Sequence, residues 1–452
     1  MSSSPSLLFL GSMDHKDEDD KAHERKDPIS LEYYIEYLLR ILEYACIWPV
    51  RSLSPLQNLL STGVTIFFLL MNLFLLLPEI AALTMSNDLK VFANIIGVIG
   101  MHAVGLIKWC YFIWKNREIV DLVKQLKMCH VLCQKINRSE EAYQIHRSEM
   151  ESARKYSNIF MWCWIFTCIY GVLHWCANPL LLEWVSNQIY SINTTFKQRN
   201  LPFIGWYPLN TNDIHNYGYL YIMQVMGGIA PAFGIICYDG FYITMLMVIC
   251  AQFQFINAIL MKNNIDKMPE TEAMLTLETE LKNCVNCHTA IIKFLKMLQA
   301  FSSPTMFVQC IETLAVLCLV SFEASTIEIA IDMESILKLW SLFEYFLCSA
   351  FELYVFCLFA TQLQFLGLQI AHSVYFCEWE NFMDFEKGAY LGKQSRRRNI
   401  YQLVQIIMMR AQKPIVLTGG PFYVLSLETF RVIMSMSMST CVMLRTVSGS
   451  NK

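Results

Sequence analysis

Seven long apolar runs are the feature that most restricts how this chain can fold. They cover residues 56–77, 89–114, 156–182, 217–255, 302–325, 336–375 and 421–446. Each reaches the ~20 residues that an α-helix needs to cross ~30 Å of hydrocarbon. Only helices and closed barrels satisfy all their backbone hydrogen bonds in lipid. The runs therefore predict an all-α membrane protein with seven transmembrane helices.

The composition agrees with a membrane protein and excludes other classes. Hydrophobic residues make up 55% of the 452 positions and charged residues only 16%, whereas a soluble domain carries about 25% charged residues. A net charge of −3 offers no basic surface for nucleic acid. Residues 7–10 are too short for the apolar core of a secretory signal, so the N-terminus is expected to stay in the cytosol.

The positively charged residues are unequally distributed between alternate loops. Lys and Arg number 27 before the first run and between runs two and three, four and five, and six and seven, but only four in the other loops. Loops rich in Lys and Arg stay in the cytosol. The N-terminus is thus expected inside and the C-terminus outside, the reverse of a G-protein-coupled receptor. Asn193-Thr194-Thr195 falls in an outer loop and is expected to be glycosylated at Asn193.

This topology divides the chain into six parts. They are a cytosolic tail and juxtamembrane segment (1–55), the first four transmembrane helices (56–255), a cytosolic connection (256–301), the fifth and sixth helices (302–375), a cytosolic anchor connection with the first part of the seventh segment (376–420), and the last helix with an extracellular C-terminus (421–452).

The seventh segment carries helix stop and start signals. Glycine suits a helix C-cap and proline a first helical turn. Lys413-Pro414 and Gly419-Gly420-Pro421 therefore predict a cytosolic helix over about 396–413 and a membrane helix that begins near Pro421.

A stripe of small hydroxyl side chains follows the last run. Ser435, Ser439 and Thr446 recur at helical spacing, with Val442 on the same side. Two interpretations stay open: the hydroxyls line a polar path, or they bond back to their own helix or pack on a neighbour.

Cysteine and histidine motifs do not predict a cofactor. Cys284-Val285-Asn286-Cys287-His288 matches a haem-attachment pattern and Cys129-His130…Cys133 a partial zinc pattern. The first is expected in the cytosol without an export signal, and the second has no evident fourth ligand. No nucleophile, phosphate loop or paired carboxylates occupy a plausible cleft, so neither enzyme activity, cofactor nor metal is expected.

Several segments resemble the insect odorant receptor family and occur in that family's order. They are Ile47-Trp48-Pro49, Leu201-Pro202…Trp206-Tyr207-Pro208, His288 with Ile291-Ile292-Lys293-Phe294, Tyr375…Trp379, Arg410-Ala411-Gln412-Lys413-Pro414…Leu417-Thr418-Gly419-Gly420, and Leu425-Ser426-Leu427-Glu428-Thr429-Phe430. The resemblance spans nearly the whole chain. One departure is Ser437-Met438-Ser439-Thr440, where the family often has Ser-Tyr-Ser-Tyr. The connection after the fourth run is short, which resembles a tuning subunit more than the coreceptor.

The resemblance implies an odorant receptor that is a subunit of an odorant-gated, non-selective cation channel. Four subunits, this chain together with the shared coreceptor, would surround a pore lined by the last helix in the plasma membrane of sensory-neuron dendrites. Ser439 and Thr446 would then face permeant cations. Alignment with the family suggests a hydrophobic gate at Met443 with Val447 one turn later, whereas the helical wheel centres Val442. For Arg431, a position in the pore and a surface position both stay open.

The family's pocket lies in the outer half of the bundle and would take a small volatile organic ligand. Cys168, Gly171 and Trp175 recur at i, i+3 and i+7, so they share one helix face. The other candidates come from three further runs: Ile95, Val98, His102, Met223, Met226, Phe351 and Tyr354. Ordinary helix packing explains these seven equally well.

The sequence is also compatible with two other classes of membrane protein. A gustatory receptor channel of the same superfamily would respond to contact chemicals. A secondary transporter would show inverted repeats, and none is evident in the sequence.

Overall fold

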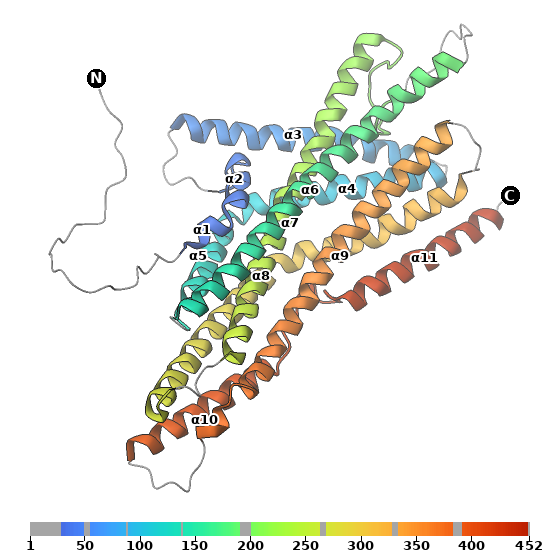
Figure 1. The fold of residues 1–452 in the computed structure, drawn as a ribbon. Coiled ribbons are helices and arrows are strands. Elements are labelled where there is room, and N and C mark those ends of the chain that lie inside the picture. The colour runs from blue at the N-terminus through green and yellow to red at the C-terminus, as the bar shows by residue number, and fades with distance from the viewer. Residues whose placement is uncertain are drawn as a thin grey trace, which may run out of the picture.

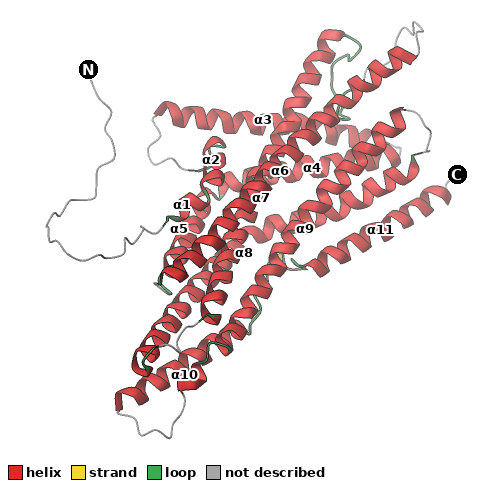
Figure 2. Ribbon diagram, viewed as in Figure 1, coloured by secondary structure: helices red, strands yellow, loops and turns green. Residues whose placement is uncertain are grey.

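The computed structural model describes residues 29–48, 55–86, 89–136, 139–189, 200–262, 268–327, 333–382 and 391–450. This part of the chain is almost entirely helical (Figure 2). The elements are α1 (Leu31–Tyr34), α2 (Glu36–Tyr44), α3 (Pro55–Met85), α4 (Leu89–Trp114), α5 (Asn116–Cys133), α6 (Glu140–Ile189), α7 (Ile214–Met261), α8 (Glu270–Thr326), α9 (Met333–Tyr375), the short 3₁₀ helix η2 (Trp379–Phe382), α10 (Leu391–Ala411), β1 (Thr418–Gly419), β2 (Tyr423–Val424) and α11 (Leu427–Ser450).

Seven of these helices are long and apolar enough to cross a membrane, which confirms the predicted fold class. They are α3, α4, α6, α7, α8, α9 and α11. At 1.5 Å per residue, the 57 residues of α8 span roughly 85 Å, far more than a bilayer requires. The long helices therefore extend beyond the membrane.

From Glu270 on, the expected cytosolic connection continues into the fifth run as one helix, α8, whereas its first residues, 256–261, belong to α7. The connection is itself amphipathic, because Leu277, Leu281, Leu295 and Leu298 are all buried along one side. This buried stripe packs α8 against α5, α9 and α10. Figure 1 shows α10 beside the ends of α8 and α9 at one end of the molecule.

Helix α7 is the centre of the bundle and α11 is at its edge (Figure 1). In the most apolar stretch of α7, 89% of residues are buried, against 11% in α11. The last helix therefore meets little of its own chain.

The crossing of α4 and α7 is close because small residues meet there. A Cβ added to Gly105 would lie 2.5 Å from Pro231, and one added to Gly234 would lie 2.4 Å from the Gly105 carbonyl oxygen. The two glycines thus allow a close approach of the α4 and α7 backbones.

The start of the last helix differs from the prediction. Residues 418–424 form a two-stranded hairpin instead of a first helical turn, and α11 begins at Leu427. Gly420 adopts a left-handed φ of 64°, and an added Cβ would lie 2.7 Å from the Phe307 ring. Its N–H donates to the Ser303 carbonyl at 3.0 Å. The glycines thus make a turn that docks on α8, and Ser426, whose hydroxyl accepts from the Thr429 N–H at 3.2 Å, caps the helix.

Candidate functional site

A cavity of about 110 Å³ lies between α4, α6, α7, α8 and α9. One water needs roughly 10–15 Å³ by this measure of volume, so the cavity has room for a small organic molecule of about eight to ten heavy atoms. Its position between helices of a bundle is typical of ligand sites.

The walls formed by α4, α6 and α7 are mostly apolar. Trp164, Trp175, Val98 and Ile235 line them. Gly228 on α7 also lines the cavity, and an added Cβ would lie 3.2 Å from the Phe203 ring. Such walls hold a ligand by shape and dispersion.

The segment before α7 contributes Phe203 to the cavity lining. Phe203 is fixed by Gln224, which accepts from its N–H at 2.9 Å and donates to its carbonyl at 3.0 Å. The Trp175 indole N–H donates to the Pro202 carbonyl at 3.1 Å. These bonds hold the Leu201-Pro202-Phe203 segment against α6 and α7.

The α8 and α9 side of the cavity is polar. Its lining includes Gln309, Glu312, Ser341, Glu344 and Glu352. Apolar and acidic side chains thus border the same cavity.

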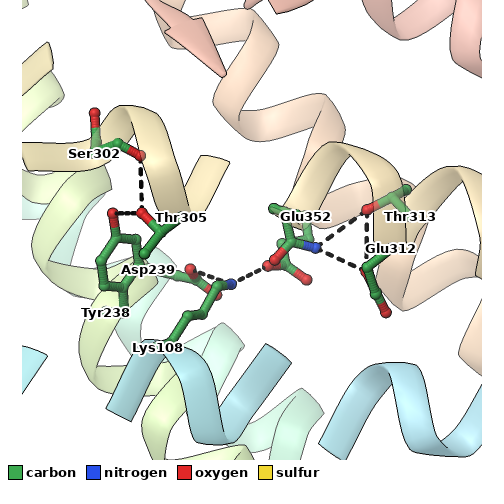
Figure 3. Close-up of polar contacts among 9 residues, drawn as sticks. Lys108, Tyr238, Asp239, Ser302, Thr305, Glu312, Thr313 and Glu352 are labelled. Atoms are coloured by element: carbon green, nitrogen blue, oxygen red, sulfur yellow. Dashed lines mark hydrogen bonds and ion pairs between the residues drawn. The ribbon is translucent and has the colours of Figure 1, made fainter. Parts of the chain in front are cut away.

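A buried ion cluster supports this polar wall (Figure 3). The Lys108 ammonium on α4 lies 2.7 Å from Asp239 on α7 and 2.6 Å from Glu352 on α9. Lys108 and Asp239 are almost completely buried. Charges inside a membrane are costly unless paired, so the cluster ties three helices together.

Four of the ten predicted pocket residues line the cavity: Val98, Cys168, Gly171 and Trp175. The three that were grouped by their helical spacing are all among them. Gly171 lies close to the polar wall, since an added Cβ would lie 3.3 Å from a Glu344 oxygen.

The other six predicted residues lie elsewhere. Ile95 is buried but does not line the cavity, and the His102 ring lies 2.9 Å from Glu79. Met223 is half-buried, whereas Met226, Phe351 and Tyr354 have exposed side chains.

Sequence reasoning missed the charged residues inside the apolar runs. Lys108, Asp239, Glu312, Glu344 and Glu352 all interrupt these runs. An ionisable residue at membrane depth is itself a signal of a functional site, so the sequence alone could have identified these five residues as candidates. Their convergence on one cavity is a property of the fold.

The predicted gate residues lie on the exposed side of α11. Met443 and Val442 are 67% and 66% exposed, and Ser439 and Thr446 are exposed as well. The Thr446 hydroxyl donates to the Val442 carbonyl at 3.0 Å, as one of the two interpretations anticipates. The Val447 side chain and the Asn193 sequon lie outside the described residues.

The cysteine and histidine motifs do not form a metal centre in the described part of the chain, where no group of three or more His, Cys, Asp or Glu side chains is arranged to hold an ion. Cys284, Cys287 and His288 are buried in the packed region of α8.

Seven helices that are long and apolar enough to cross a membrane, five of which line a cavity with room for a small ligand, define a multi-pass membrane protein with a candidate ligand site. A profile of the 7tm odorant receptor family matches residues 88–438. The chain belongs to this family and is an odorant receptor, the class that forms subunits of odorant-gated channels.

Individual relatives agree. The chain is 19% identical over 340 residues to odorant receptor 83a of Drosophila melanogaster, a match that covers 66% of this chain and 68% of that one. It is 20% identical over 412 residues to odorant receptor 67c of the same species, covering 90% and 93%. The solved structure of the olfactory receptor OR5 from Machilis hrabei in complex with eugenol superimposes with a TM-score of 0.72 at 15% identity, covering 92% of this chain and 98% of that one. The last comparison shows that the fold is shared.

Proposed function

We propose that a small volatile organic molecule binds in the cavity and opens a cation pore lined by α11. The observation that carries the proposal is that the two helices of the polar cavity wall also hold the start of α11. Binding favours whichever conformation makes the better contacts with the ligand, so a ligand that moves α8 or α9 also acts on α11.

The link through α9 consists of two contacts. The Leu427 N–H, at the first residue of α11, donates to the Thr361 hydroxyl at 3.0 Å. The Tyr354 and Phe430 rings meet edge to face with centroids 5.5 Å apart. Tyr354 is two residues after Glu352, which lines the cavity.

The link through α8 is the hairpin. Gln299 donates to the Thr418 carbonyl at 3.0 Å and accepts from the Thr418 N–H at 2.8 Å. Gln309 and Glu312 follow on the same helix and line the cavity.

The gate is assigned to Met443, with Val442 and Val447 as neighbours and Ser439 and Thr446 on the conducting path. Apolar constrictions close narrow pores by excluding water. The high exposure of α11 in a single chain supports a position where other subunits complete its surroundings.

The assembly is proposed to be a heterotetramer with the odorant receptor coreceptor. It would lie in the plasma membrane of sensory-neuron dendrites, with the N-terminus inside and the C-terminus outside. Only eight residues separate Met261, the end of α7, from the start of α8, which supports a tuning subunit.

The test is patch-clamp recording from cells that express this chain with a coreceptor, during application of a broad odorant panel. An odorant-evoked cation current that is absent with the coreceptor alone is expected. Met443→Ser should raise the current in the absence of odorant, while Met268→Ser, a matched exposed methionine between α7 and α8, should not. Absence of any odorant-evoked current from surface-expressed complexes would contradict the proposal.

A further inference from the structure

The ionisable side chains that line the polar side of the cavity are all carboxylic acids. Glu312, Glu344 and Glu352 line it, whereas no Lys, Arg or His of the described chain does. Figure 3 shows Glu312 and Glu352 on neighbouring helices of this wall. This side therefore offers no cationic partner to an anionic ligand.

Basic side chains nearby already contact two of these three acidic residues. Lys108 bridges Asp239 and Glu352, and the His174 ring lies 2.7 Å from one oxygen of Glu344. Glu352 and Glu344 therefore each have a basic partner.

Glu312 is the carboxylate that this arrangement leaves without a cation. Gln309 and Thr313 both donate to the same oxygen, Oε2, at 3.1 and 3.4 Å, and both belong to α8 itself. Among the described residues, no Lys, Arg or His forms an ion pair with Glu312. A carboxyl group at such a site either keeps its proton or pairs with a cation.

Two buried oxygen atoms of this wall lack a hydrogen-bond partner, and both are acceptors. Gln309 is 1% exposed and its Oε1 has no hydrogen-bond partner, nor has Oε1 of Glu344. The hydroxyls of Ser341 and Tyr345 already donate to backbone carbonyls at 2.9 and 2.8 Å. Buried acceptors without partners are costly, so this wall fits a ligand that brings several donors.

We propose that the cavity selects small organic amines, with the ammonium group held by Glu312, Glu344 and Gln309 and the apolar part packed against the α4, α6 and α7 walls. This inference rests on the cavity being the odorant site. An ammonium group supplies up to three N–H donors and the missing positive charge. A neutral amine that takes the proton of Glu312 yields the same ion pair, so charge and protons balance.

The indole N–H of Trp164, which also lines the cavity, lacks a partner as well. A neutral ketone or ester could accept a bond from it. Benzylamine, benzyl alcohol and toluene share one ring and differ in the polar group, so they separate these possibilities.

The first experiment compares these three compounds at pH 7.4 on the complex with the coreceptor. Hydrogen bonds to charged groups contribute about 1.5–3 kcal/mol, so half-maximal activation by benzylamine is expected at a concentration about ten- to hundredfold below that of benzyl alcohol. Equal potency of the amine and the alcohol, or a stronger response to a neutral ester or ketone, would overturn the amine assignment.

Substitutions of the glutamates test which of them binds the ammonium group. Glu312→Gln keeps size and a donor but removes the negative charge, so it should weaken the benzylamine response about ten- to hundredfold and spare the alcohol. Glu344→Gln should act in the same direction. Glu272→Gln, in the exposed first turn of α8, is the matched control. An unchanged benzylamine response in Glu312→Gln would mean that Glu312 is a protonated donor and would overturn the proposal.

Binding separates this inference from the channel function. Trp164 and Trp175 line the cavity, so quenching of tryptophan fluorescence in the purified complex reports occupancy without gating. Saturable quenching by benzylamine that is lost in Glu312→Gln, without any current, would uphold the amine site and reject the proposed gating. A current evoked by neutral compounds, without fluorescence quenching by benzylamine, would support the channel function and reject the amine site.

Discussion

The backbone N–H of Leu427, at the first residue of α11, donates to the Thr361 hydroxyl in α9 at 3.0 Å. The first N–H groups of a helix have no partner within that helix. Here a side chain from another helix supplies one, so the last helix is joined to α9 by a polar contact as well as by packing.

This contact predicts the effect of Thr361→Val. Loss of one helix-capping acceptor costs about 1 kcal/mol, so the dose–response curve for an odorant should shift severalfold, with cavity occupancy unchanged. Thr279→Val is the control, because the Thr279 hydroxyl bonds only within its own helix, to the Leu275 carbonyl. Superimposable curves for the wild type and Thr361→Val would show that the cap does not transmit gating.

A second prediction concerns the apolar wall. Trp175→Ala should raise the odorant concentration for half-maximal activation about ten- to hundredfold, because it removes a large apolar surface from the cavity. Trp184→Ala, at an exposed position later in α6, should change it little. Electrophysiology with matched surface-expression assays makes the comparison, and equal shifts for both variants would argue against the cavity as the binding site.

The buried ion cluster predicts a stability effect. Lys108→Met leaves the carboxyls of Asp239 and Glu352 without their cation, which should lower the free energy of unfolding by about 3 kcal/mol or more. Neutralising all three residues, as Lys108→Met/Asp239→Asn/Glu352→Gln, should recover part of the loss. Thermal denaturation of the solubilised protein measures both, with the exposed Lys124→Met as control. A triple variant no more stable than Lys108→Met would refute the pairing argument.

A pH effect is expected outside the membrane, where α5 packs on the N-terminal helices. Burial lowers the pKa of His130 below its ordinary value of 6.5. The folded state then binds fewer protons than the unfolded state, so the stability from neutral His130 is complete above pH 6.5 and falls as the pH drops towards the lowered pKa.

His130 lies 3.0 Å from the Ile29 carbonyl and its ring is 5.0 Å from that of His146. Acidification from pH 7.5 to 5.5 should therefore lower the hydrogen-exchange protection factors of residues 29–44, which are corrected for the intrinsic pH dependence of amide exchange, and His130→Gln should reduce this loss. Equal pH dependence in the variant would assign the effect to other groups.

The cavity illustrates how far residue patterns predict a site. The spacing of Cys168, Gly171 and Trp175 placed them on one face of a helix, and all three line the cavity. The predictions for Met226 and Phe351 rest on residue type alone, in helices that are apolar on all sides, and both side chains lie exposed. Where every face is apolar, periodicity carries no information about which face points inward.

The start of α11 shows a similar limit. Glycine and proline signals correctly indicated a break between two helices, but a helix cap and a hairpin use the same residues. The choice of a hairpin depends on contacts of Thr418 and Gly420 with α8, which lies more than a hundred residues earlier.

The sequence by itself determined that the chain is a helical membrane protein with seven crossings. The length and apolarity of each run can be read directly from its residues and compared with the thickness of the hydrocarbon layer. Only the tertiary structure decided that Lys108, Asp239 and Glu352 meet, and that Glu312 faces the cavity without a cation. Those relationships depend on the rotation and crossing of separate helices. The rotation and the crossing angle of each helix are set by the packing of its side chains against other helices, so the sequence of one helix does not determine them.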